Sequence, residues 1–298
     1  MSNYIGQFAA LATAFCWAIT SVSFETAGKK LGALNLNLIR LVLGMIFLSI
    51  YTFITRGFLL PLDASLETWK WLLLSGLVGV VLGDMFLFEA FVQIGARISM
   101  LIYASVPPIS GVLAYIFLGE SMTGWQIIGM FITLSGIAIV ILVRGDGDSK
   151  IKFAHPLLGI LLAFGGAFGQ SLGYIIGKYG MSDYNAFAST QIRLIAGIIG
   201  FTIIFTIKGN WGKLVASLKR KKGLVTATIG SIFGPFIGIS LSLMAVQYVN
   251  PGVASTLTSI TPILLIPYVL LIKKEKVLLR ELLGSFLTIG GVAIMFLS

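Results

Sequence analysis

Long apolar runs recur along the whole chain, and short polar segments separate them. Each run is about 20 residues long, which is enough for an α-helix to cross a bilayer. The runs are continuous and do not alternate apolar and polar positions, so they predict helices and not the strands of a barrel. The pattern therefore predicts an all-α integral membrane protein with ten transmembrane helices. We place these spans near residues 4–26, 34–55, 69–90, 97–118, 123–143, 157–177, 185–207, 224–247, 253–272 and 277–297.

The second part of the chain repeats the first. The segment GMFITLSGIAIVIL, which begins at Gly129, matches GSFLTIGGVAIMFL, which begins at Gly284, an offset of 155 residues. The same offset pairs Pro107 with Pro262. Chance similarity between apolar helices is the alternative, but the matched residues include proline and charged side chains.

The repeat divides the chain into two five-span halves, residues 1–148 and 149–298. Because five is odd, the second half starts on the opposite side of the bilayer, and the two repeats are inverted. Inverted repeats are a common basis for alternating access, in which the substrate site lies near the midplane between the halves.

Two prolines fall near the middle of the fourth and ninth spans. A proline inside a helix removes a hydrogen bond one turn earlier. In a membrane this is tolerated where protein or a water-filled cavity satisfies the freed group. We therefore expect Pro107 and Pro262 to kink their helices beside a central cavity, with the hydroxyls of Ser105, Thr258 and Ser259 nearby. A packing kink with no ligand role is the alternative.

Glycines four residues apart form a small face on two spans. Such faces let helix backbones approach closely in lipid, so we interpret them as packing surfaces. Cys16, at the position in the first span that matches Gly169, is interpreted as a further small packing residue. The glycines are Gly165, Gly169, Gly173 and Gly177 in the sixth span, and Gly230, Gly234 and Gly238 in the eighth.

Ionisable residues inside membrane helices are functional candidates by default. Arg40 and Arg193 lie 153 residues apart, in spans two and seven. Asp84 and Glu89 lie near the end of the third span, and we expect Asp84 to pair with Arg40 at a similar depth. The second half has apolar residues in place of the two acids. Side chains that reach the interface without a functional role are the alternative.

Aromatic and amide side chains that carry a polar group are further candidates for substrate binding. The alternative is that they only pack helices together. Trp17 and Gln170 hold equivalent positions in spans one and six, and Tyr103 and Tyr174 lie in spans four and six. The full set of candidates for substrate binding or cavity lining is Trp17, Arg40, Asp84, Glu89, Tyr103, Ser105, Pro107, Gln170, Tyr174, Arg193, Thr258, Ser259 and Pro262.

Composition and charge narrow the classes of function. The chain is 57% hydrophobic and has a net charge of +10, but its Lys and Arg lie in the breaks between apolar runs, so nucleic-acid binding is not expected. Sixteen of them fall on the face reached after the first span and three on the terminal face. The positive-inside rule then places both termini outside the cytoplasm. One histidine and one cysteine predict neither a metal site nor a disulfide, and we expect no cofactor.

Together these features resemble the EamA family of the drug/metabolite transporter superfamily. The resemblance rests on the two five-span halves, the mid-span prolines, the segments LGES and KKEK, and the Gly-rich closing span. It implies an exporter or exchanger of small metabolites, such as amino acids or related compounds, in a plasma membrane (the inner membrane in bacteria). A monomer would suffice for transport. Members of the superfamily are usually drawn with cytoplasmic termini, so the orientation stays open.

Two other classes fit the sequence less well. An intramembrane enzyme would need clustered acids, His–acid metal ligands or a Ser/Lys pair, and a passive channel would show a filter loop or a ring of like charges. We therefore expect a secondary transporter and no enzymatic activity. The substrate, the direction of transport and its coupling to ions or protons are not encoded in any pattern we find.

Overall fold

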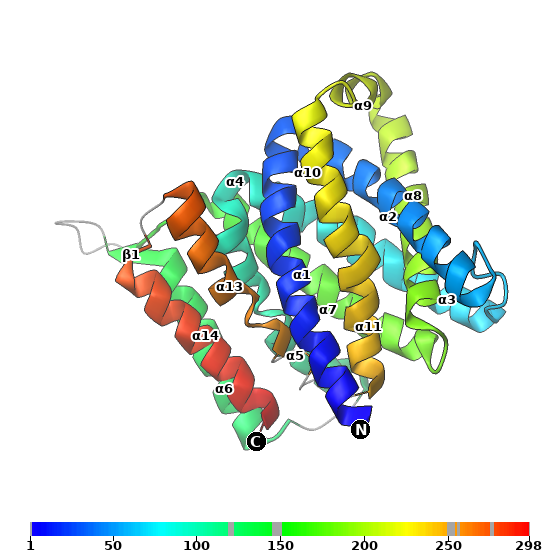
Figure 1. Cartoon of the computed structure of the whole chain (residues 1–298). Coiled ribbons are helices and arrows are strands. Elements are labelled where there is room, and N and C mark those ends of the chain that lie inside the picture. Colours follow the sequence, from blue (N-terminus) through cyan, green and yellow to red (C-terminus); the bar gives the residue numbers. More distant parts are fainter. Residues whose placement is uncertain are drawn as a thin grey trace.

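Helices form nearly all of the chain in this computed structural model (Figure 1). The structure describes residues 2–118, 122–144, 151–248, 254, 257–274 and 277–297. Within these ranges, seven helices are long and apolar enough to cross a membrane, which agrees with the multi-pass membrane protein expected from the apolar runs. They cover Tyr4–Leu31, Ala33–Arg56, Leu66–Tyr103, Gly124–Ile141, Leu157–Met181, Ala186–Lys208 and Lys221–Ala245.

The first half of the chain is a series of helices that ends in a short hairpin. The helices are α1 (Ser2–Leu31), α2 (Ala33–Arg56), α3 (Leu66–Ser75), the π-helix η1 (Gly76–Gly83), α4 (Asp84–Tyr103), α5 (Val106–Leu118) and α6 (Gly124–Ile141). The strands β1 (Leu142–Arg144) and β2 (Ile151–Phe153) pair antiparallel, with Val143 opposite Lys152.

The second half of the chain is also a series of helices. Its elements are α7 (Leu157–Met181), α8 (Ala186–Lys208), α9 (Trp211–Ser217), α10 (Lys221–Ser231), the π-helix η2 (Ile232–Gly238), α11 (Ile239–Tyr248), α13 (Thr261–Tyr268), the π-helix η3 (Val269–Lys273) and α14 (Leu279–Leu297). Residues 253, 255 and 256, at the start of the predicted ninth span, and residues 249–252 before it lie outside the described residues.

The third and fourth predicted spans meet at Gly95, inside α4. Gly95 has φ 80° and ψ 159°, so the helical path is interrupted there. An L-residue with a side chain rarely adopts a positive φ of this size, whereas glycine does so at little cost. The residues after Gly95 therefore leave in a new direction and begin the fourth span.

The two prolines start helices and do not kink them, so the expectation of kinked continuous spans is wrong. Pro107 is the second residue of α5 and Pro262 is the second residue of α13. Proline is favoured at this place because the first N–H groups of a helix have no intrahelical partner to lose. The chain turns between α4 and α5, and the Ile109 N–H then bonds the Ser105 carbonyl at 3.0 Å.

The glycine faces make the close helix contacts that the sequence predicts. A Cβ added to Gly169 would lie 2.8 Å from the Cα of Gly83, and one added to Gly173 would lie 2.8 Å from the Cα of Gly79. The Ser75 hydroxyl also donates to the Gly173 carbonyl at 2.6 Å. Helix α7 thus lies directly against η1, with no side chain between the two backbones.

The closing helices α6 and α14 form an antiparallel pair at one edge of the molecule (Figure 1). The backbones of the two helices are so close that no side chain fits between them. A Cβ added to Gly129 would lie 2.5 Å from the Gly291 carbonyl oxygen, and a Cβ added to Gly136 would lie 2.6 Å from the Gly284 carbonyl oxygen. The ends of the chain, marked N and C in Figure 1, lie on the same side of the molecule.

Two apolar clusters surround the middle of the fold. One joins buried side chains of α1, α2 and α4, including Phe24, Phe88 and Phe91. The other joins α2 and η1 to α8 and α11, including Leu41 and Phe201. The polar side chains of the candidate site lie on the elements that these clusters hold together.

Candidate substrate site

Arg40 and Asp84 form the ion pair that the sequence predicts. Arg40 lies seven residues after the start of α2, and Asp84 begins α4 directly after the π-helix η1. The Arg40 Nη2 donates to the Asp84 Oδ2 at 2.6 Å, and the two residues are 1% and 7% exposed. The Arg40 Nε also donates to the Asn37 Oδ1 at 3.1 Å, and its guanidinium lies 4.5 Å from the Phe88 ring centroid. Arg40 is therefore both charge-paired and hydrogen-bonded.

Arg193 holds the matching place in the second half but lacks these partners. It lies seven residues after the start of α8 and is 0% exposed. Its Nε and Nη1 are buried with no hydrogen-bond partner among the described residues. The guanidinium carbon lies 5.9 Å from the ring centroid of Tyr174. A cation without an anionic partner in the interior of a protein is energetically costly.

Gly79 of η1 packs closely beside this guanidinium. A Cβ at Gly79 would lie 3.1 Å from the Nη2 of Arg193 and 3.4 Å from the Oε1 of Gln170. Gln170, on α7, is itself buried. The arginine and the amide thus approach the same point on the π-helix, where only a glycine fits between them and α7.

Two tyrosines connect the arginines. Tyr103, near the end of α4, lies within electrostatic range of Arg40, Asp84, Tyr174 and Arg193. The cluster therefore draws on helices α2, α4, α7 and α8. Its formal charge is +1, because Asp84 neutralises only one of the two arginines.

Ser242 of α11 joins this cluster, although no pattern in the sequence selects it. The Tyr174 hydroxyl lies 2.7 Å from the Ser242 Oγ. A serine within an apolar helix has no distinguishing spacing, and its role follows only from the packing of α11 against the rest of the fold.

The structure places several other candidates outside this cluster. The Glu89 carboxylate accepts a hydrogen bond from Gln93 at 3.1 Å, on its own helix. Trp17, a residue of α1, packs against both apolar clusters. Ser105 is buried, and its Oγ has no hydrogen-bond partner among the described residues. Thr258 donates to the Ala254 carbonyl at 3.1 Å.

The remaining three candidates lie at or next to the helix starts. Pro107 and Pro262 occupy the first turns of α5 and α13, and Ser259 is buried in the turn before α13. They shape the backbone where two spans are interrupted.

Charged contacts close the end of the molecule at which α1 ends. Glu25 is 2% exposed, and its Oε1 accepts from both Lys29 and Lys273 at 2.6 Å. Its Oε2 accepts from the Ala96 N–H at 3.0 Å, directly after the break at Gly95. Glu25 therefore ties α1 to α4 and η3.

A second ion pair strengthens the same end. The Arg97 Nη1 donates to the Glu281 Oε2 at 2.8 Å, which joins α4 to α14. Glu281 is buried and was not selected from the sequence, because it lies at the boundary of an apolar run.

Polar contacts also join elements at the opposite end. The Asp63 carboxylate accepts from Arg56 at 2.6 Å and from the Tyr184 hydroxyl at 2.8 Å. Partial burial raises the pKa of Asp63, but these two interactions outweigh it and hold the pKa below its usual value. The contacts tie the loop after α2 to the loop between α7 and α8.

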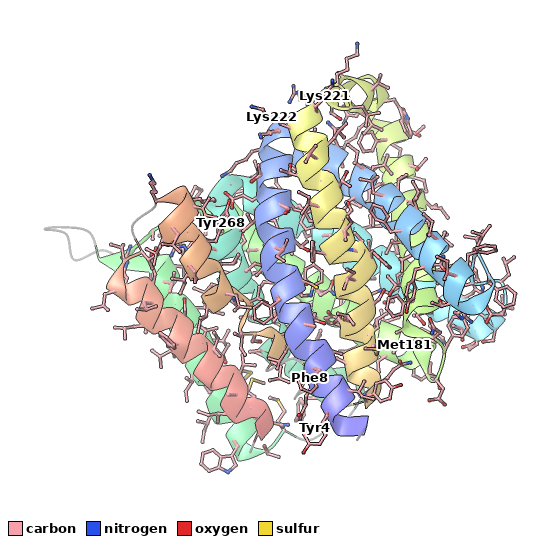
Figure 2. The ribbon with its side chains drawn as sticks, in the orientation of Figure 1. Tyr4, Phe8, Met181, Lys221, Lys222 and Tyr268 are labelled. Carbon is pink, nitrogen blue, oxygen red and sulfur yellow. The ribbon has the colours of Figure 1, made fainter. Side chains whose placement is uncertain are left out.

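A basic pocket of about 500 Å³ lies at the surface, where α1 ends and α10 begins. Figure 2 shows Lys221 and Lys222 at this end, opposite Tyr4 and Phe8. Arg220 donates to the Lys30 carbonyl across it. Its lining residues are Lys29, Lys30, Lys219, Arg220, Lys221, Lys222 and Gly223. None of them belongs to the arginine–tyrosine cluster.

Within the described ranges, no three His, Cys, Asp or Glu side chains gather closely enough to hold a metal ion. The buried cluster offers guanidinium, hydroxyl and amide groups, which suit the binding of polar organic groups.

Comparison with known proteins shows the family. The model of the EamA-like transporter family matches residues 4–142 and 157–297. The uncharacterized transporter YdfC of Bacillus subtilis is 25% identical over 275 residues, which cover 88% of this chain and 81% of YdfC. The uncharacterized transporter YvbV of the same organism is 25% identical over 240 residues, 77% of this chain and 72% of YvbV.

More distant similarity extends to a human protein and to solved structures. Human solute carrier family 35 member G1 is 24% identical over 224 residues, 72% of this chain and 59% of that protein. A crystal structure superposes with a TM-score of 0.67 at 14% identity and covers 98% of this chain and 96% of its own, which shows a shared fold. The matched family, the named relatives and the apolar helices together identify the chain as a multi-pass membrane transporter, and not an enzyme, of the EamA-like transporter family.

Proposed function

We propose that the protein is a secondary transporter that moves a small metabolite by alternating access, through export or exchange. Its moving parts are two inverted five-helix repeats, residues 1–148 and 149–298. The contact between α6 and α14 carries this proposal. In a pair related by two-fold symmetry, residue i contacts j and the counterpart of j contacts the counterpart of i. With the offset of 155, the counterpart of Gly129 is Gly284 and the counterpart of Gly136 is Gly291. Gly129 contacts Gly291, and Gly136 contacts Gly284, so the two contacts follow this rule. The two helices run antiparallel.

Two further features support the pair of repeats. The π-helices η1 and η2 fall at matching places, 76–83 and 232–238, and π turns are frequent at functional sites. Each packs on the first two helices of the other half: η1 on α7 and α8, and η2 on α1 and α2. The family model also matches the chain twice, once in each half.

The charged contacts at the two ends of the molecule suit the role of gates. Glu25 with Lys273, and Arg97 with Glu281, join elements of the two halves at the end that holds the basic pocket. Asp63 with Tyr184 joins the halves at the other end. Alternating access requires that such contacts form at one end while those at the other end break.

Spin-label distances across each end test this mechanism without knowledge of the substrate. One pair, Asn35 of the first repeat and Leu271 of the second, would report the basic end, and the other, Ile116 and Tyr179, the opposite end. Asn35 is half-buried in the first turn of α2, and the other three side chains are exposed. The labels would be introduced into a Cys16→Ala background, since Cys16 is the single native cysteine.

Glu25→Gln should then lengthen the Asn35–Leu271 distance and shorten the Ile116–Tyr179 distance, because it weakens the contacts that close the basic end. Glu67→Gln is the matched control, since the Glu67 carboxylate is exposed and accepts from Trp71 on its own helix. Distances that lengthen together at both ends would indicate a channel, and unchanged distances would contradict alternating access.

A further inference from the structure

We infer that Arg193 binds the carboxylate of a small anionic substrate that carries one net negative charge at its recognised end. This inference rests on the proposed transport function and names the substrate class and the residue that reads it. It is carried by the difference between Arg193 and its counterpart Arg40, which hold the same place in α8 and α2.

The partners of Arg40 account for its charge. Asp84 lies 2.6 Å from one guanidinium nitrogen, Asn37 lies 3.1 Å from another, and the Phe88 ring faces the group at 4.5 Å. The pair is neutral as a unit, and its members are held by α2 and α4. Arg40 therefore has a structural explanation that needs no ligand.

Arg193 has no such explanation. Its Nε and Nη1 are both buried without a hydrogen-bond partner among the described residues, and no carboxylate there forms an ion pair with it. Asp84 is near enough for electrostatic interaction with Arg193, but its carboxylate is engaged by Arg40. The planar fork of a guanidinium matches a carboxylate, which accepts two parallel N–H bonds.

The surroundings of Arg193 fit an organic carboxylate. Gly79 packs closely beside the guanidinium, and the Gln170 amide approaches the same point. The Tyr174 ring lies 5.9 Å from the guanidinium carbon, and its hydroxyl is held by Ser242. An aromatic face can contact the apolar part of a substrate while the arginine holds its charged end.

The charge balance of the cluster sets the charge of the ligand. With Asp84 neutralising Arg40, one positive charge remains, and one bound carboxylate cancels it. A phosphate dianion would leave an excess negative charge in the interior, and a cation would add to the positive charge, so both are disfavoured.

Two measurements on the purified full chain in detergent test the inference. The first is the melting temperature without ligand. Arg193→Gln should melt no lower than the wild type, because it removes a buried charge that lacks a partner, whereas Arg40→Gln should melt lower because it leaves Asp84 unpaired. If Arg193→Gln melts as low as Arg40→Gln, the side chain is a structural partner and the inference is overturned.

The second measurement is stabilisation by probe anions at constant ionic strength. The probes are lactate, pyruvate, glutamate and succinate, each beside its amide, together with inorganic phosphate and choline. At least one carboxylate should raise the melting temperature of the wild type more than its amide does. Arg193→Gln should weaken that apparent affinity by at least about tenfold, and Arg193→Lys should weaken it less. Lys70→Gln should leave it unchanged, because Lys70 is exposed and pairs with Glu67 on its own helix.

The outcomes separate the inference from the proposed function. Stabilisation by phosphate or choline alone, by no probe, or equally in wild type and Arg193→Gln, would overturn the assignment of Arg193. Opposite changes in the two spin-label distances would still support alternating access in that case. Unchanged distances with carboxylate binding intact would instead leave Arg193 as a binding residue in a protein that does not alternate.

Discussion

Removal of the Asp84 charge should destabilise the protein through its effect on Arg40. In Asp84→Asn, the guanidinium stays charged and 1% exposed, but its carboxylate partner at 2.6 Å is replaced by a neutral amide. Asparagine has nearly the same size as aspartate, so the packing around α4 is preserved and the loss of charge is isolated.

The structure sets the magnitude of this effect. Removing one partner of a buried ion pair costs about 3–5 kcal/mol, because an uncompensated charge is left behind. Two other contacts of Arg40 remain, the hydrogen bond to Asn37 at 3.1 Å and the Phe88 ring at 4.5 Å, and they place the expected loss near the lower limit, about 3 kcal/mol. For a chain of this size this corresponds to a fall in melting temperature of about 6 °C.

A double-mutant cycle measured by thermal melting in detergent tests the reasoning. Arg40→Gln combined with Asp84→Asn leaves two neutral amides, so the double variant should recover most of the stability that Asp84→Asn loses. Asp183→Asn is the control, because Asp183 is an exposed loop residue. A normal melting temperature for Asp84→Asn, or a double variant that melts as low as Asp84→Asn, would refute the ion-pair account.

Three further predictions concern packing, orientation and pH. Gly291→Leu should lower the folded yield sharply, because its Cβ would overlap the backbone of α6. Gly290→Leu should fold normally, since open space lies beside Gly290. Equal yields of the two variants would contradict the close helix pair. The charge bias predicts that the termini lie outside the cytoplasm. In a cysteine-free background, an impermeant maleimide should then label Asp63→Cys but not Lys213→Cys in intact cells. The reverse labelling pattern would place the termini in the cytoplasm. Burial lowers the pKa of His155, so its contribution to stability is complete above about pH 6.5 and is lost as the pH falls through the folded-state pKa. His155→Asn should therefore flatten the fall in melting temperature between about pH 7 and pH 5, and an unchanged pH profile would argue against a role for His155.

The sequence alone determined the features that a single helix displays. Apolar runs long enough to cross a bilayer identify a membrane protein, since no water is present in the lipid interior to satisfy an irregular backbone. Glycines four residues apart share one helix face, and the structure shows Gly169 and Gly173 against Gly83 and Gly79. These patterns are periodic along the chain, so they can be read before the partner helix is known.

Local patterns were less informative where the backbone changes direction. Two mid-span prolines suggested kinks, yet Pro107 and Pro262 begin new helices. A proline is compatible with a kink or with a first turn, and the choice depends on how the preceding segment packs. Gly95, where α4 is interrupted, carried no signal that distinguished it from the many other glycines of the chain.

Only the tertiary structure decided which charges are satisfied. Arg40 and Arg193 occupy matching places in matching helices, but the fold brings Asp84 to the first and leaves the second facing Gly79 and Tyr174. Glu25 likewise meets Lys273, 248 residues away. The partner of a buried charge comes from another helix, and helical periodicity carries no information about which helices will be neighbours. The free energy of a buried charge depends on that partner, so the sequence could name the candidate arginines while the fold determined which one is left for a ligand.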